Sequence, residues 1–170
     1  MNDQPILNRV ANSPLKSLDL EDYFPKGNTL SFDIADNLYN GMILREKDFR
    51  EFIKNHDWLQ YHGKFVAIFC SVDAIVPTWA YMLLASKMNP HAKLVVFGEI
   101  KELHRSMWDL AINKIKAEDF KDAKVVVKGC GDLPETEYGY VALTQALLPV
   151  VSTLMYGEPC STVPIYKKKK

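Results

Sequence analysis

The sequence lacks a long uninterrupted hydrophobic run. Its longest apolar region, residues 141–155, is broken by Pro149 and by polar side chains. It therefore falls short of the roughly 18 apolar residues that a membrane-spanning helix needs. Near Met1, Asp3 and Arg9 interrupt any apolar core of a signal peptide. We therefore expect a cytoplasmic protein that does not insert into a membrane.

The chain also lacks an excess of charge of one sign. Its 170 residues carry 21 basic and 21 acidic side chains, so the formal net charge is zero. A nucleic-acid-binding domain presents a broad basic surface, which this balance does not favour. Hydrophobic residues make up 48% of the chain and aromatic residues 11%, which excludes intrinsic disorder. The length predicts a single domain over residues 1–170.

Several catalytic motifs are absent as well. The sequence has no Walker A phosphate loop, no G-x-S-x-G nucleophile elbow and no H-E-x-x-H zinc motif. Cysteine is scarce: Cys70, Cys130 and Cys160 are the three in the chain, and they form no C-x-x-C pair. This odd, widely spaced set argues against the disulfide framework of a secreted protein. The three thiols are the main candidates for chemistry.

Alternating hydrophobic patterns predict an α/β fold. Buried strands are predicted at 64–70, 94–97 and 125–127, with helices at 46–55, 78–88, 100–111 and 140–156, the last capped by Gly157. Strands that alternate with helices in this way form a mostly parallel sheet with right-handed crossovers. We therefore predict a Rossmann-like sandwich with helices on both faces of the sheet.

The segments that flank this βαβ core, which spans residues 46–157, are predicted separately. Residues 1–28 form an N-terminal extension with a short helical stretch at 6–11. Residues 29–45 predict a β-hairpin, because Asn40-Gly41 favours a type I′ turn. Residues 158–170 are predicted to be a C-terminal tail that ends in four solvated lysines.

Two loops after predicted strands carry chemically versatile residues. Cys70 is followed by Asp73, and Gly129-Cys130-Gly131 is followed by Asp132. Open parallel sheets bind ligands beyond the carboxyl ends of their strands. If the two strands are neighbours or next neighbours, Cys70 and Cys130 lie within about 5–10 Å of each other. Thiolates with carboxylates would then form a mixed metal site.

Simpler explanations exist for these residues. Free cysteine often packs as a small buried hydrophobe. Asp73 and Asp132 also suit the capping positions of the helices that follow them. Cys160 falls at the far edge of the sheet unless the helix at 140–156 bends or the tail folds back.

Gly129 and Gly131 are the least ordinary residues of these loops. Glycine permits a close approach of the backbone to a ligand or a tight turn. We therefore expect the backbone N–H groups around Cys130 to hold a species bound to its sulfur.

Four longer sequence segments resemble those of a known family. They are Ile43–Arg50, Ala74–Met82, Lys128–Asp132 and Gly157–Pro164. With them, nearly the whole chain resembles an uncharacterised family of the Bacteroidetes, catalogued as a domain of unknown function. The resemblance implies a link to iron–sulfur metabolism, since genes of this family lie near genes for iron–sulfur cluster assembly. Iron–sulfur clusters and sulfur carriers both use cysteine thiolates.

Three functional hypotheses follow. The first is an accessory metal-binding or sulfur-handling factor of iron–sulfur metabolism, with iron–sulfur assembly proteins as partners and zinc, iron or an iron–sulfur cluster as its group. Its ligands would be Cys70, Cys130, Cys160, Asp73 and Asp132. The second is a thiol enzyme or redox switch, with Cys130 as nucleophile and Cys70 as resolving thiol. The third is a noncatalytic homo-oligomer that packs through the helix at 140–156.

Overall fold

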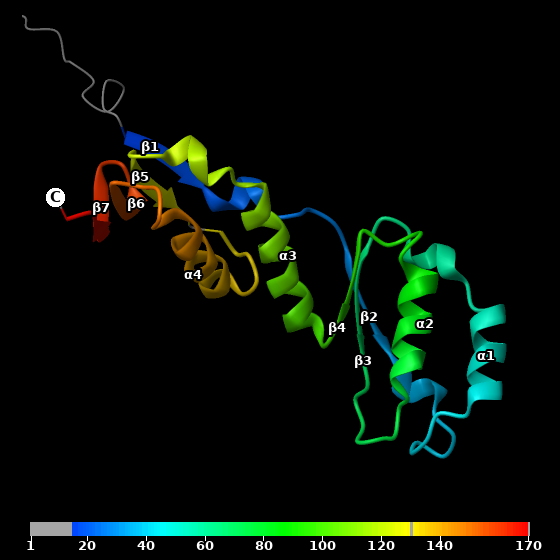
Figure 1. The fold of residues 1–170 in the computed structure, drawn as a ribbon. Coiled ribbons are helices and arrows are strands. Elements are labelled where there is room, and N and C mark those ends of the chain that lie inside the picture. Colours follow the sequence, from blue (N-terminus) through cyan, green and yellow to red (C-terminus); the bar gives the residue numbers. More distant parts are fainter. Residues whose placement is uncertain (1–14, 130, 170) are drawn as a thin grey trace, which may run out of the picture. The chain divides into compact units, whose positions relative to one another are not determined.

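The computed structural model describes residues 15–129 and 131–169 (Figure 1). These residues form two compact units: unit 1 comprises 15–24 and 108–169, and unit 2 comprises 25–107. Unit 2 is thus inserted, in sequence, between the first strand of unit 1 and the rest of that unit. The helical stretch predicted at 6–11 lies outside the described residues. The prediction of one domain concerns cooperative folding and stays a prediction.

Unit 2 is built on a parallel sheet with the strand order β2-β3-β4. Its strands are β2 (Thr29–Asp33), β3 (Phe65–Phe69) and β4 (Leu94–Phe97). Helices α1 (Glu46–Asn55) and α2 (Thr78–Met88) lie in the connections between them, and α3 (Ile100–Lys114) follows β4. The unit boundary at residue 107 falls within α3.

The core of unit 2 follows directly from its sequence patterns. Helix α1 buries Phe49 and Ile53 and exposes most of its charged residues, as an amphipathic helix does. Strand β3 is the central strand, and Val66 and Ala67 in it are fully buried. Helices α1 and α2 lie on the same side of the sheet (Figure 1). Their apolar residues form one buried cluster with those of β2 and β3. The predicted boundaries of α1, α2 and β4 are confirmed.

The predicted hairpin is present only as a short loop. Asn40 and Gly41 have φ values of 51° and 69°, as a type I′ turn requires. Tyr39 and Ile43 pair across this turn, with an N–H···O distance of 2.8 Å from Tyr39 to Ile43. Strand β2 before it pairs in parallel with β3 instead. The apolar alternation of β2 needs a buried neighbour, and the continuously apolar β3 provides one.

Unit 1 is built on a four-stranded sheet with the order β1-β5-β6-β7. Its strands are β1 (Leu15–Asp19), β5 (Lys124–Lys128), β6 (Thr153–Glu158) and β7 (Ser161–Lys167). The first three are parallel, and β7 runs antiparallel to β6. Helix α4 (Thr136–Leu147) connects β5 to β6. The α/β class with mostly parallel strands is confirmed, and its strands are divided between two sheets.

The helix predicted at 140–156 is wrong in its second half. Helix α4 ends at Leu147, and the chain continues as β6. Pro149 cannot continue a helix, because its nitrogen carries no hydrogen. The edge of β5 supplies hydrogen-bonding partners for β6, a long-range effect that overrides local periodicity. Gly157, with φ of 118°, lies in β6 and caps no helix, and the predicted tail contains β7.

Candidate functional site

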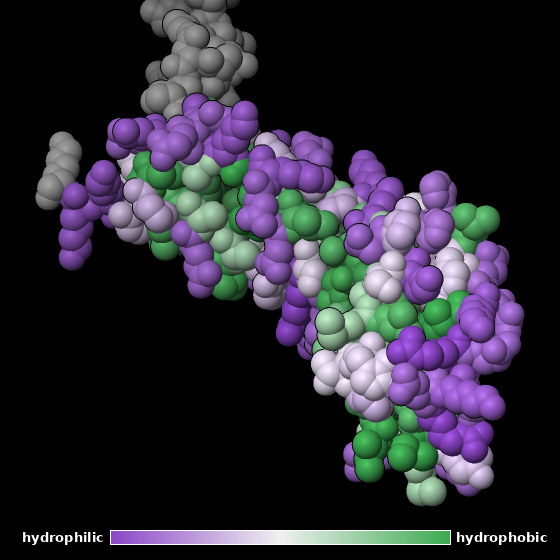
Figure 2. Space-filling model, turned by 45° about the vertical axis from the view of Figure 1, so that its right-hand side comes forward, coloured by the Kyte–Doolittle hydropathy of each residue, from purple (hydrophilic) through white to green (hydrophobic). Residues whose placement is uncertain are grey.

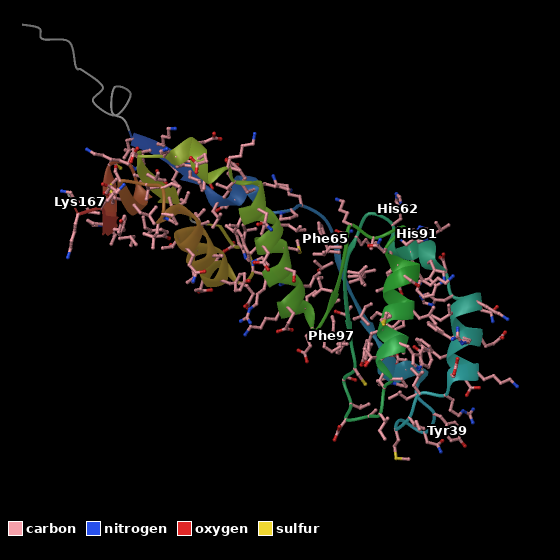
Figure 3. The ribbon with its side chains drawn as sticks, viewed as in Figure 1. Tyr39, His62, Phe65, His91, Phe97 and Lys167 are labelled. Carbon is pink, nitrogen blue, oxygen red and sulfur yellow. The ribbon has the colours of Figure 1, made fainter. Side chains whose placement is uncertain are left out.

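An open cavity lies at the carboxyl end of the sheet in unit 2. Its volume is about 450 Å³, and its walls come from the ends of β3 and β4 and the start of α3. The lining residues are Phe69, Cys70, Phe97, Gly98, Glu99, Lys101 and Glu102. Figure 3 shows Phe97 at the end of β4, beside the start of α3. This is the edge at which open parallel sheets bind their ligands.

Cys70 contributes a thiol to this cavity. It follows directly on β3 and is half-buried, and its Sγ donates a hydrogen bond to the backbone oxygen of Val72 at 3.2 Å. At the start of α3, the N–H of Glu99 donates to the Glu102 carboxylate at 3.0 Å. Glu102 therefore serves the helix terminus, and the Lys101 side chain is the cation at the cavity wall. A small ligand in the cavity would meet a thiol, an ammonium group, two aromatic rings and the side chains of Glu99 and Glu102.

Asp33, at the end of β2, holds the loop that carries Cys70. Its carboxylate accepts hydrogen bonds from the N–H of Ala35 at 2.9 Å and of Ser71 at 3.1 Å. Burial raises the pKa of Asp33, but hydrogen bonds from the Ser71 side chain and from these two amides together hold the pKa below 3.8. The ionised carboxylate thus connects the ends of β2 and β3.

Replacing Asp33 by Ala should destabilise the protein by about 1 kcal/mol, the usual effect of removing a capping carboxylate. Because folding lowers the pKa of Asp33, its contribution is complete well above pH 3.8 and is lost as the pH falls below that value. Urea unfolding at neutral and at acidic pH measures both effects. The difference between wild type and variant should vanish in acid, and a difference that persists there would contradict the assigned hydrogen bonds.

Tyr81 of α2 lies close enough to Cys70 and Asp33 for their charges to act on it. Burial raises its pKa, and the charges of Cys70 and Asp33 raise it further. Its ring packs edge-on against Phe97 with the ring centroids 5.0 Å apart. Sequence reasoning missed Asp33, Tyr81 and Phe97. The available signal for Phe97 was its position at the carboxyl end of the strand predicted at 94–97.

The loops around this end of unit 2 carry exposed apolar side chains, which we call the apolar rim. Its residues are Tyr39, Met42, Ile43, Val72 and Ile75. The two loops are joined, because the N–H of Ile75 donates to the backbone oxygen of Met42 at 3.0 Å. Figure 2 shows hydrophobic side chains exposed at this end of unit 2. Large exposed apolar patches are found where proteins bind other proteins, membranes or ligands.

Neither aspartate of the sequence-predicted site caps a helix. Asp73 and Asp132 are both exposed. The residues at the N-terminal caps of α2 and α4 are Pro77 and Glu135, and neither makes a side-chain capping hydrogen bond. The capping explanation is therefore wrong for both aspartates, because each lies too far ahead of its helix.

Gly129 and Gly131 make room for side chains of unit 1. A Cβ atom at Gly129 would overlap the hydroxyl oxygen of Tyr140, and one at Gly131 would overlap the carboxylate of Glu21. The Tyr156 hydroxyl also donates to the backbone oxygen of Gly129 at 3.0 Å. Side chains of the same chain therefore occupy the space beside these glycines. Their binding of a sulfur-bound species stays a prediction.

The cysteines do not follow strands of one sheet. Cys70 follows β3 of unit 2, whereas Cys130 belongs to the segment after β5 of unit 1 and lies outside the described residues. The premise that both follow nearby strands of one sheet is therefore wrong. Cys160 is exposed in the turn between β6 and β7, at the carboxyl end of β6. The exception stated for its place at the far edge therefore applies, because strand β6 brings the chain back.

No three His, Cys, Asp or Glu side chains among residues 15–129 and 131–169 come together to hold a metal ion. Figure 3 shows His62 and His91 at the end of unit 2 opposite Tyr39. The metal site predicted from the sequence includes Cys130 and therefore stays a prediction. Its other ligands were Cys70, Cys160, Asp73 and Asp132.

The fold and the cavity define an α/β protein with a thiol at the carboxyl end of a parallel sheet. The chain belongs to the family described as protein of unknown function (DUF2480), whose model matches residues 4–168. The resemblance to a family of unknown function is thereby confirmed, while the Bacteroidetes and the gene neighbourhood stay predictions. No curated protein and no solved structure matches the chain. Within the described part, no helix is both long and apolar enough to cross a bilayer.

Proposed function

We propose that this protein is a sulfur-handling factor of iron–sulfur metabolism in which Cys70 accepts sulfur and passes it on. The observation that carries the proposal is the Cys70 thiol in an open cavity of about 450 Å³ at the carboxyl end of parallel strands. A cysteine with a purely structural role packs as a buried hydrophobe. Cys70 differs, because it is half-buried and faces the cavity.

We propose a small sulfur compound such as a polysulfide as the ligand of this cavity. Phe69 and Phe97 form apolar walls, and Lys101 supplies a positive charge beside the carboxylates of Glu99 and Glu102. The Cys70 thiolate attacks the end sulfur of the polysulfide, so that a new S–S bond forms at Cys70. The adjacent S–S bond of the polysulfide breaks, and the shortened polysulfide leaves with the electron pair. The thiol proton goes to solvent.

A partner protein would take the sulfur at the same end of unit 2. The apolar rim surrounds the loop that carries Cys70, and patches of this kind bind proteins. Iron–sulfur assembly proteins are the partners we propose.

Exposure of the anaerobically purified chain to polysulfide, followed by mass spectrometry of its peptides, tests the proposal. We expect the wild-type protein to gain one sulfur atom at Cys70, and Cys70→Ser to lose this gain. Cys160→Ser is the matched control, because Cys160 is exposed but lies outside the cavity. Sulfur found on Cys130 or Cys160 but not on Cys70 would contradict the proposal.

Metal binding is the other form of the same hypothesis. Iron, zinc and acid-labile sulfide are measured per chain in the same anaerobic preparation. Near-stoichiometric metal that Cys70→Ser removes would make Cys70 a metal ligand, and sulfur transfer would then no longer be its role.

An apolar groove on unit 1 favours self-association as a second function. The groove has a volume of about 350 Å³ and lies between α4 and the β6–β7 hairpin. At its wall, Val141 is 59% exposed and Ile165 is 53% exposed. The edge of β7 itself suits strand pairing poorly, because it contains Pro164. We therefore propose that a second copy covers the groove through side-chain packing.

Replacing Val141 and Ile165 together by Glu should convert the protein into a monomer. A charge in an apolar interface loses its hydration without gaining a partner. Light scattering on dilute protein measures the molecular mass of both forms. The matched control is Lys87→Glu with Lys54→Glu, on exposed positions of unit 2. A wild-type protein that is strictly monomeric would contradict self-association.

A further inference from the structure

The backbone of Lys167 and Lys168, near the end of the chain, is paired with strand β6 or the residue before it. Lys167 is the last residue of β7 and lies opposite Thr153 of β6. The N–H of Lys168 donates to the backbone oxygen of Ser152 at 2.9 Å, so the pairing continues beyond the strand. The prediction of a tail is therefore wrong for the backbone of these two residues, which the sheet holds, while their side chains are exposed.

These lysines line a cavity of about 360 Å³ at the amino end of β5 and β6. Its residues are Lys124, Ser152, Thr153, Lys167, Lys168 and Lys169, which we call the lysine pocket. The register of the sheet explains the cluster, because Thr153 pairs with Lys124 on one side and with Lys167 on the other. Figure 3 shows Lys167 extending from the end of β7.

The lysine pocket concentrates positive charge in a chain whose net charge is zero. Asp122 offsets part of it, since its carboxylate lies 3.8 Å from the Lys168 ammonium group. Four ammonium groups and this one carboxylate leave three positive charges. Lys16 of β1 is engaged elsewhere, because its ammonium group donates to the backbone oxygen of Asp119. The sheet register thus places four lysines of like charge at one edge of unit 1.

We propose that the lysine pocket binds a phosphate-bearing anion. An anion with two or more charges relieves the repulsion among the ammonium groups. Lysine binds phosphate as a compact point charge, whereas planar carboxylates are best matched by the arginine fork. All four cations of the pocket are lysines, and Thr153 lines it as well, whereas the Ser152 hydroxyl already donates to the backbone oxygen of Ala123 at 2.9 Å.

Titration of the full chain with inorganic triphosphate in a calorimeter tests this proposal. The pocket variant is Lys124→Gln with Lys167→Gln. The control is Lys54→Gln with Lys87→Gln, which removes the same charge from exposed positions of α1 and α2. We expect saturable binding that weakens at least about tenfold in the pocket variant and is unchanged in the control. Added salt should weaken the binding further.

Three outcomes would overturn the proposal. Equal weakening in both double variants would make the effect one of net charge, and an absence of saturable binding would remove the site.

Vesicles of phosphatidylcholine with and without phosphatidylserine distinguish a lipid headgroup from a free phosphate compound. Anionic vesicles that compete with triphosphate identify headgroups as one source of the anion, and a lack of competition identifies a soluble compound. Binding to anionic vesicles without any binding of triphosphate would overturn the pocket. Far-UV circular dichroism confirms that each variant is folded.

Discussion

Replacing Val126 by Asp should unfold the protein. Val126 is the middle residue of β5 and is 0% exposed, with Ser17 of β1 on one side and Met155 of β6 on the other. No buried residue among those described is polar or charged, so the new carboxylate would have no partner. An unpaired buried charge costs a large part of the roughly 5–15 kcal/mol that stabilises a typical domain.

Circular dichroism and limited proteolysis measure this result. Lys124→Asp is the control, because Lys124 is exposed on the same strand and its variant should stay folded. If residues 1–170 form one cooperative domain, Val126→Asp unfolds unit 2 as well. A protease-resistant fragment that contains residues 25–107 would contradict the single domain. A soluble variant that melts cooperatively would contradict the placement of β5.

Replacing Trp108 by Ala should destabilise the protein by about 3–5 kcal/mol, the usual loss for a large buried aromatic side chain. Trp108 is 1% exposed, and its ring centroid lies 4.4 Å from that of Phe24. Its Nε1–H donates to the backbone oxygen of Pro134 at 2.8 Å. Gly139 of α4 approaches the indole so closely that a Cβ atom there would overlap it. The substitution would leave a cavity and an unpaired carbonyl.

Urea unfolding measures this loss of stability. The variant Trp108→Phe separates the contribution of packing from that of the hydrogen bond. Phe retains most of the packing against Phe24 but cannot donate to Pro134, so its loss should be about 1–3 kcal/mol. A loss of less than about 1 kcal/mol in Trp108→Ala would contradict the packing described for unit 1.

Elements whose own residues carry a clear period could be predicted from the sequence. Helix α1 has Phe49, Phe52 and Ile53 on one face among charged residues, and its predicted bounds are confirmed. The bounds of strand β4 could be predicted equally well from its short apolar run. Strand β6 was not, because its apolar residues also continue the spacing of α4, and only pairing with β5 distinguishes the two.

Strand partners depend on the whole chain and could not be predicted. Strand β1 pairs with β5, although the 83 residues of unit 2 separate them in sequence. No local pattern in Leu15–Asp19 indicates that partner. For the same reason the division into two sheets was missed, and with it the fact that Cys70 and Cys130 follow strands of different sheets.

The candidate site was predicted in part. Cys70 was identified because a thiol after a buried strand lies at the ligand-binding edge of a parallel sheet. Asp33 and Phe97 were missed, because their place beside Cys70 depends on β2 and β4 flanking β3. At Gly129, the contact with the Tyr140 hydroxyl could not be predicted, because it depends on how α4 packs beside the end of β5.

The central claim is that the Cys70 thiol is accessible from the cavity that it lines. The rate at which Cys70 is alkylated in the native chain tests this claim most directly. Peptide mass spectrometry compares the rate at Cys70 with the rate in the urea-unfolded chain, with the exposed Cys160 as internal reference. We predict that native Cys70 reacts within about tenfold of its unfolded rate, as an accessible thiol does. Protection of Cys70 until the protein unfolds, as for a core cysteine, would contradict the claim.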